Sequence, residues 1–285
     1  PVPGLPNFFI AAGFAAGVMQ AAASRLVAEW IAEGEPSLDP GPVDVRRYGA
    51  YATKAFTYAV VRAGHKFAGA VDYPYGERGT GRPGKASALH DRHKAARAVF
   101  GARNGWEVPL WFAPDGMDAT EQPRFGRPNW FDAVGAECRA LTTRAGLLDR
   151  SSLAKLEVSG PGAAALLDRL SAARLPDRTG DVAIAPFLTE QGGIAALFTI
   201  VRMASERFLL TAPPEFEIRD YDHLARTLPN DGSVALKNMS ARNGLLLLAG
   251  PRAAEILSRL TTADLSPAGF PWGTARSLSV GNTNV

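Results

Sequence analysis

Apolar residues in the first seventy positions repeat with the spacing of an α-helix. Val18, Leu26 and Trp30 fall on one face of a helix predicted over residues 17–32, and Gly34 stands where that helix ends. A short apolar run, FFIAA, precedes this helix, so the pattern predicts a strand–turn–helix corner whose turn contains Gly13 and Gly17. A second helical pattern covers residues 52–63.

The pattern then loses its period and returns near residue 130. Residues 64–132 are rich in Gly, Pro and Arg, which predicts packed, irregular loops with one helix near residues 90–100. Four isolated aromatic residues are expected to anchor these loops to a core: Trp106, Trp111, Phe112 and Trp130.

Alternation of apolar and polar residues marks the second half as mixed α and β structure. Strands are predicted at 153–160, 182–188, 194–201, 207–211 and 244–250, and helices at 132–144, 161–172, 219–228 and 252–260. No period of 20–50 residues recurs, so a repeat protein is excluded. The fold class is therefore α+β, with a domain boundary near residue 130.

Composition and charge narrow the class of protein further. The 285 residues are 46% hydrophobic and 21% charged, and no apolar run reaches the ~18–20 residues of a membrane span. The net charge of +3 is scattered, which argues against a nucleic-acid partner. The single cysteine, Cys138, excludes an internal disulfide framework and fits a reducing compartment such as the cytoplasm. Because the chain begins with Pro1, we expect a piece of a longer polypeptide.

The opening glycines allow two interpretations. A dinucleotide fingerprint requires G-x-G-x-x-G, whereas Gly13 and Gly17 form G-x-x-x-G, so the fingerprint is not matched. The turn is either a plain structural corner or a helix N-terminus whose free N–H groups face an electron-rich ring oxygen or a phosphate.

Other polar residues point to structural roles. The four histidines show no metal-ligand spacing, so no metal site is expected, and no residue is assigned a catalytic role. Asp149 to Ser152 lack the context of a nucleophile elbow and are interpreted as a turn or helix cap. Asp220 and Asp222 are interpreted as a solvated edge.

Longer stretches carry a resemblance to a known family. The stretches are NFFIAAGFAAGVMQAAASRLVAEWIAEGEPSLDPGPVDVRRYG, the central GERGTGRPGKASALHDRHKAARAVFGARNGWEVPLWF, then RPNWFDAVGAECRAL, GLLDRSSLAKLEVSGPGAAALLDRL, LLLLAGPRAAEIL and DLSPAGFPW. In this order, over essentially the whole chain, they resemble the dimethylglycine and sarcosine dehydrogenase family. That family joins an FAD-dependent oxidoreductase to a folate-binding domain related to the aminomethyltransferase (T-protein) of glycine cleavage.

The resemblance implies three regions. Residues 1–49 would be the last strand and helix of a Rossmann-like FAD domain, residues 50–130 a connecting region, and residues 131–285 the first part of the aminomethyltransferase domain. It further implies that the early turn contacts the flavin ring, and its residues are Gly13, Phe14, Gly17, Val18 and Met19.

The implied activity is oxidative demethylation of an N-methylglycine derivative, a small methylated amine. Hydride passes to FAD, and oxygen or an electron-transfer protein then accepts the electrons. The one-carbon product passes to tetrahydrofolate or hydrolyses to formaldehyde. The pocket positions implied for folate are Leu153, Ile184, Leu197 and Leu209.

One of these positions departs from the family pattern. Leu197 stands where the family carries an acidic residue, and a leucine can neither accept a proton nor hydrogen-bond an amine. The alternative hypothesis is a non-catalytic folate-binding or scaffold protein with the T-protein fold.

Overall fold

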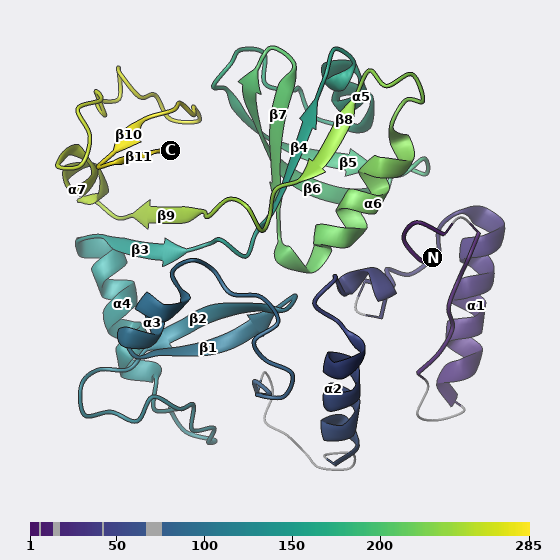
Figure 1. Cartoon of the computed structure of the whole chain (residues 1–285), viewed down its shortest axis with the longest axis horizontal. Helices are drawn as coiled ribbons and strands as arrows, with labels where there is room; N and C mark the ends of the chain where they lie inside the picture. The colour runs from purple at the N-terminus through teal and green to yellow at the C-terminus, as the bar shows by residue number, and fades with distance from the viewer. Residues whose placement is uncertain (6, 14–17, 42, 67–75) are drawn as a thin grey trace.

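The computed structural model describes residues 1–5, 7–13, 18–41, 43–66 and 76–285 of the chain. Figure 1 shows an α+β molecule in which one helix, α1, stands at the side of a five-stranded sheet. The helices are α1 (Val18–Glu33), α2 (Lys54–Lys66), α3 (His90–Ala95), α4 (Phe131–Thr143), α5 (Ala163–Leu170), α6 (Glu217–Thr227) and α7 (Ala253–Ser258), with short 3₁₀ turns η1 (Val45–Arg47) and η2 (Pro214–Phe216). The strands are β1 (Ala98–Arg103), β2 (Trp106–Phe112), β3 (Gly146–Asp149), β4 (Ala154–Ser159), β5 (Val182–Leu188), β6 (Ile194–Ala204), β7 (Arg207–Ala212), β8 (Ala235–Asn238), β9 (Leu246–Ala249), β10 (Ser279–Val280) and β11 (Thr283–Asn284).

The main core lies between the five-stranded sheet and two helices. The sheet is antiparallel with strand order β5-β6-β7-β4-β8. Alternate residues of its strands are buried against Leu166 and Leu167 of α5 and Leu224 of α6, among them Leu156, Phe187, Phe198, Ile200, Phe208 and Leu210. Period-two alternation places these residues on one face, so the predicted strands in this region are confirmed.

The opposite face of this sheet carries the remaining alternate residues. Ile184 and Leu197 on this face are 68% and 55% exposed. Ile184 is paired with Thr199 and Leu197 with Pro186, so these side chains project away from α5 and α6. We call this surface the open face.

A hairpin over residues 98–112 interrupts the irregular loops predicted for residues 64–132, which are confirmed at residues 76–89 and 113–130. Strands β1 and β2 pair antiparallel, and α3 ends at Ala95 instead of near residue 100. Trp106 and Trp111 are buried, which confirms their anchoring role, although they lie in a strand. Pro109 and a register shift after Val99 interrupt the strand pattern, which explains why alternation did not reveal the hairpin.

The N-terminal region differs from the prediction in one respect. Helix α1 follows the predicted bounds closely, and Gly34 after it has φ +87°, a conformation suited to a glycine at a helix end. Residues 8–13, however, belong to no strand, because among the described residues no strand pairs with them to supply hydrogen bonds. The predicted strand of the corner is therefore wrong.

The solvated edge predicted for Asp220 and Asp222 on α6 is wrong, because both side chains are buried. Asp220 is 1% exposed, and Asp222 is also buried. The turn η1 packs against α6 and brings Arg46 to Asp222, so this edge is an internal contact between distant segments. Among the helices that the structure describes, none combines the length and the apolar character that crossing a bilayer requires.

Candidate functional site

The first candidate site is the turn before α1. Gly13 has φ +85°, and a Cβ built on it would meet no atom within 4 Å, so the backbone borders open space. The first turn of α1 carries no acidic residue, and Met19 is exposed there. A helix N-terminus attracts negative charge, so the start of α1 is suited to an anionic or electron-rich group. Phe14 and Gly17 lie outside the described residues, and Val18 is the first residue of α1.

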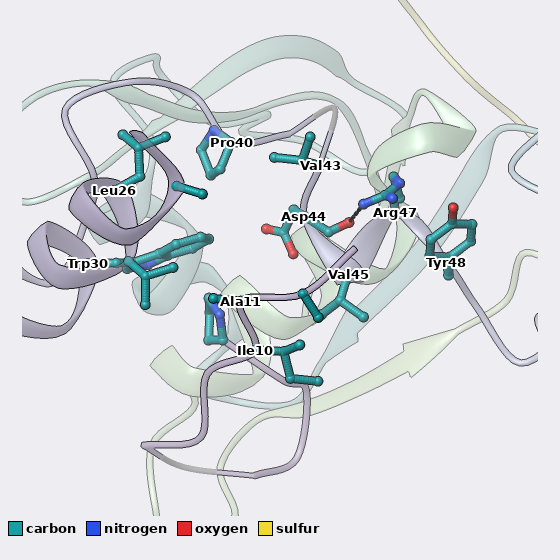
Figure 2. Close-up of a pocket in the computed structure, with 14 residues that line it drawn as sticks. Ile10, Ala11, Leu26, Trp30, Pro40, Val43, Asp44, Val45, Arg47 and Tyr48 are labelled. Atoms are coloured by element: carbon teal, nitrogen blue, oxygen red, sulfur yellow. Dashed lines mark hydrogen bonds between the residues drawn. The ribbon is translucent and has the colours of Figure 1, made fainter. Parts of the chain in front are cut away.

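An apolar cleft of about 260 Å³ lies beside α1 (Figure 2). Figure 2 shows Leu26 and Trp30 of α1 on one side and Ile10 and Ala11 on another. The backbone carbonyl of Asp44 accepts a hydrogen bond from Arg47 Nη1 at 2.7 Å, which fixes the loop on the far side. Sequence patterns indicated the helix face but not this cleft, because it forms where α1 meets the loop before η1.

The second candidate site is the open face of the sheet. The four positions predicted for folate come from adjacent strands in the order β5, β6, β7 and β4: Ile184, Leu197, Leu209 and, one residue before β4, Leu153. In the register, Ile184 pairs with Thr199, so it lies diagonally across from Leu197. Leu209 pairs with Val201, four residues along β6 from Leu197. The structure thus brings Ile184 close to Leu197 and places the other two further along.

One carboxylate lies on the same face. Glu157 of β4 is the register partner of Leu209, and its Oε1 is 4.0 Å from Lys237 Nζ. Its side chain is partly exposed. Glu157 therefore places a carboxylate on the open face, whereas Leu197 is apolar. The strand that carries Glu157, β4, lies two strands from β6.

Lys155 of β4 is a residue that sequence reasoning missed. It is 2% exposed, and its Nζ donates to the carbonyl oxygens of Ser151 at 2.8 Å and Leu153 at 2.7 Å. Burial lowers the pKa of Lys155 to about 8, against the opposing effect of Glu217 and Asp149. An alternating strand with one lysine does not signal burial, because lysines at strand positions are ordinarily solvated.

Asp149 joins the connecting region to the end of β3. Its Oδ2 accepts from Ser87 Oγ at 2.6 Å and lies 3.1 Å from His93 Nε2, while its Oδ1 accepts from the Ser151 backbone at 2.9 Å. Burial would raise the pKa of Asp149, but these hydrogen bonds outweigh it and hold the pKa below the usual value. The turn predicted for Asp149 to Ser152 is confirmed. Within the described ranges, no cluster of three or more His, Cys, Asp or Glu side chains has the arrangement of a metal site.

A larger cleft, of about 430 Å³, lies where the segment after α1 meets the β5–β6 turn and α6. Residues that line it include Trp30, Glu35, Asp39, Ala195, Arg219 and His223. We call it the junction cleft. Ala195 precedes Leu197 by two residues on β6, so the junction cleft borders the open face. Burial, with Arg219 and Arg46 nearby, lowers the pKa of His223 below its usual value.

Known proteins match the chain along its whole length. Human "Dimethylglycine dehydrogenase, mitochondrial" is 34% identical over 288 residues, covering 100% of this chain and 33% of the relative. Mouse "Pyruvate dehydrogenase phosphatase regulatory subunit, mitochondrial" is 30% identical over 290 residues, covering 99% of this chain and 33% of the relative. The chain thus spans about a third of the length of these relatives.

A solved structure resembles part of this fold. The aminomethyltransferase T of the glycine cleavage system from Bartonella henselae superposes with a TM-score of 0.50 and 27% identity, covering 62% of this chain and 43% of that one. The resemblance to the dimethylglycine and sarcosine dehydrogenases is confirmed by these matches. The model of the GCVT N-terminal domain matches residues 89–285, well over half of the chain, and the chain therefore belongs to the GCVT N-terminal domain family.

Proposed function

We propose that the chain is part of an FAD-dependent amine dehydrogenase or oxidase that oxidatively demethylates a dimethylglycine- or sarcosine-type substrate. The observation that carries the proposal is the similarity to human dimethylglycine dehydrogenase over all of the chain. Bound FAD would supply hydride acceptance, so that oxidation of the N-methyl carbon leaves an iminium that carries the one-carbon unit. Oxygen or an electron-transfer protein would be the final electron acceptor.

The turn before α1 would serve as the second contact to the flavin. Gly13 has no side chain and borders open space, and the free N–H groups at the start of α1 would hydrogen-bond the ring. These groups stabilise negative charge on the ring, which favours hydride acceptance. The proposal includes the division into residues 1–49, 50–130 and 131–285, with the first region as the end of a Rossmann-like FAD domain.

The open face would hold tetrahydrofolate by packing. Ile184 and Leu197 offer exposed apolar surface to a flat pterin ring. Leu197 supplies no proton acceptor, so Glu157 would be the group that hydrogen-bonds a pterin N–H or an amine on this face. The tetrahydrofolate nitrogens would attack the iminium carbon, releasing the demethylated amine and a proton. Otherwise water attacks, and formaldehyde is released.

The test uses the polypeptide purified from its source cells, at whatever length it has there. Its mass and flavin content are measured first, and dimethylglycine is then added without oxygen. We expect loss of the oxidised-flavin absorbance and a shift of product from formaldehyde to methylenetetrahydrofolate when tetrahydrofolate is present. A polypeptide without flavin, or a flavin that the amine does not reduce, would contradict the proposal.

The second candidate function is a non-catalytic folate-binding or scaffold protein. The apolar Leu197 favours it, and one relative similar over the chain is named as a regulatory subunit. The same experiment separates the two, because a scaffold binds folate without oxidising the amine. A cytoplasmic location is also part of the proposal. The human and mouse relatives, in contrast, are named as mitochondrial.

A further inference from the structure

The junction cleft contains charged groups of both signs, and most of its arginine charge is already paired. Arg46 donates to Asp44 at 2.7 Å and to Asp222 at 3.1 Å, so neither its charge nor theirs is left for a ligand. Four other polar side chains of the lining keep unused hydrogen-bonding capacity: Glu35, Asp39, Arg219 and His223.

Two carboxylates face the cleft from the segment after α1. Glu35 Oε1 accepts a hydrogen bond from Thr189 Oγ1 at 3.3 Å, and Asp39 Oδ1 accepts one from the Gly41 backbone at 2.9 Å. Within the described residues, the second oxygen of each accepts no hydrogen bond from the protein. Neither carboxylate has an arginine or lysine partner there, so this side of the cleft is suited to a cation.

Trp30 supplies an aromatic surface beside these acids. The guanidinium of Arg46 lies 5.2 Å from its ring centroid, within the range of a cation–π contact. Arg46 therefore already covers part of this ring, and the methyl groups of an alkylated ammonium would gain from contact with the part of Trp30 that lines the cleft.

Two groups on α6 face the cleft with unused hydrogen-bonding capacity. Arg219 donates from Nε and Nη2 to Asp220 Oδ1, both at 3.1 Å, and its Nη1 has no acceptor among the described residues. His223 Nε2 is buried and has no hydrogen-bond partner in the described part of the chain. A buried polar atom without a partner is costly, and a ligand carboxylate would satisfy an N–H of each of these groups.

We propose that the junction cleft binds a small zwitterionic amino acid whose amine is methylated. The ammonium would lie between Glu35, Asp39 and Trp30, and the carboxylate at Arg219 and His223. This ligand class is that of the proposed substrate, so the inference rests on the proposed function for the choice of ligand. The cleft borders the open face, but its lining includes none of the residues assigned to flavin or folate, so it is a further binding site.

Binding is measured on the full chain, without flavin or folate, by NMR of selectively labelled histidines. N,N-dimethylglycine is titrated as the zwitterion, with acetate and tetramethylammonium as probes of each half. The His223→Gln variant identifies the resonance of His223. We expect a saturable shift of this resonance with dimethylglycine, and binding of each half-probe weaker by about tenfold or more.

Two matched pairs of variants locate the charges. Arg219→Gln and Glu35→Gln should each weaken dimethylglycine binding by about tenfold. Arg252→Gln and Glu255→Gln change an exposed ion pair at the start of α7 and should leave dimethylglycine binding unchanged. If circular dichroism shows that Arg219→Gln is unfolded, Arg219→Lys, which keeps the charge, takes its place in the binding measurement.

Three outcomes would overturn the proposal. One is the absence of a saturable shift at His223, and another is equal weakening by the α7 variants. The third is a half-probe that binds as well as dimethylglycine, which would mean a site for a simple anion or cation. Since this experiment involves neither flavin reduction nor folate, its failure is distinguishable from failure of the proposed function.

Discussion

Arg46 and Asp222 are 176 residues apart in the sequence, and their side chains meet at 3.1 Å between Nη1 and Oδ2. Both side chains are largely buried, and Asp222 also pairs with Arg226 at 3.0 Å. This contact joins η1 to α6, and so connects the region that follows α1 to the helix that covers the main sheet. It also forms part of the boundary of the junction cleft, which exists only while the two segments stay docked.

The first prediction is that Asp222→Ala releases this docking. Removing one partner of a buried pair leaves the other charge uncompensated, which costs about 3–5 kcal/mol in well-buried cases. Because Arg46 keeps Asp44, we expect a loss of about 2 kcal/mol in the free energy of unfolding, measured in urea. Limited proteolysis should also cut the segment between Gly34 and Val45 faster.

The matched control is Glu255→Ala, which removes an exposed acid paired with Arg252 and Arg259. No measurable change is expected there, since exposed ion pairs contribute little. Equal effects of the two variants would show that the contact between Arg46 and Asp222 does not hold the segments together.

The second prediction concerns the backbone of Gly13. At φ +85° an alanine is strained by roughly 1–2 kcal/mol, although a Cβ would meet no neighbouring atom. Gly34, at the other end of α1, has φ +87° and equally open surroundings. We therefore expect Gly13→Ala and Gly34→Ala to lower the unfolding temperature similarly.

Flavin binding separates the two glycines. Only Gly13→Ala should reduce the flavin content of the native polypeptide, measured as the ratio of flavin to protein absorbance, because only Gly13 lies on the N-terminal side of α1. An equal reduction in both variants would assign the effect to helix strain, and no reduction in either would remove Gly13 from the flavin site.

The contrast between α1 and the β1–β2 hairpin shows how far sequence patterns reach. For α1, apolar spacing and Gly34 agree, so its bounds could be predicted closely. For the hairpin, Pro109 and the shifted register break the alternation, and its aromatic residues suggested loop anchors. A pattern that depends on period two fails where the ladder itself is irregular.

The candidate site shows a different limit. Sequence resemblance placed Ile184 and Leu197 together, and strand alternation confirms that they share a face. Segments distant in sequence bury Asp220, Asp222 and Lys155, so no local pattern could indicate the burial of these side chains. The junction cleft likewise depends on the docking of η1 against α6.

The third prediction is that Leu197→Asp increases tetrahydrofolate-dependent capture of the one-carbon product. Leu197 is 55% exposed, so the charge remains solvated and the fold should tolerate it. A carboxylate there can accept a proton from the folate or the amine. The measurement is the ratio of methylenetetrahydrofolate to formaldehyde formed by the native polypeptide.

Met203→Asp is the matched control, because Met203 is also exposed on β6 but lies six residues from Leu197 and outside the junction cleft. Its product ratio should stay at the wild-type value. If Leu197→Asp leaves the ratio unchanged as well, Leu197 does not lie at the folate site.

The last prediction is a pH dependence from Asp220. Burial raises the pKa of this carboxyl to about 6 from its ordinary value of 3.8, in spite of the opposing effect of Arg219. Between these two values the folded state binds more protons than the unfolded state, so this residue makes stability fall as pH rises from about 4 to about 6. Above about pH 6 the full cost of burying the charge is present.

Asp220→Asn removes that cost, and its side-chain oxygen can still accept from Arg219. We expect the variant to be more stable than the wild type at about pH 7, by on the order of 1–2 kcal/mol, with the difference vanishing near pH 4. Urea unfolding at both pH values measures this. Asp149→Asn should instead lower the free energy of unfolding at pH 7, because hydrogen bonds to the charged carboxylate lower the pKa of Asp149. A variant at Asp220 that is less stable at pH 7 would mean that its pairing with Arg219 outweighs the cost of burial.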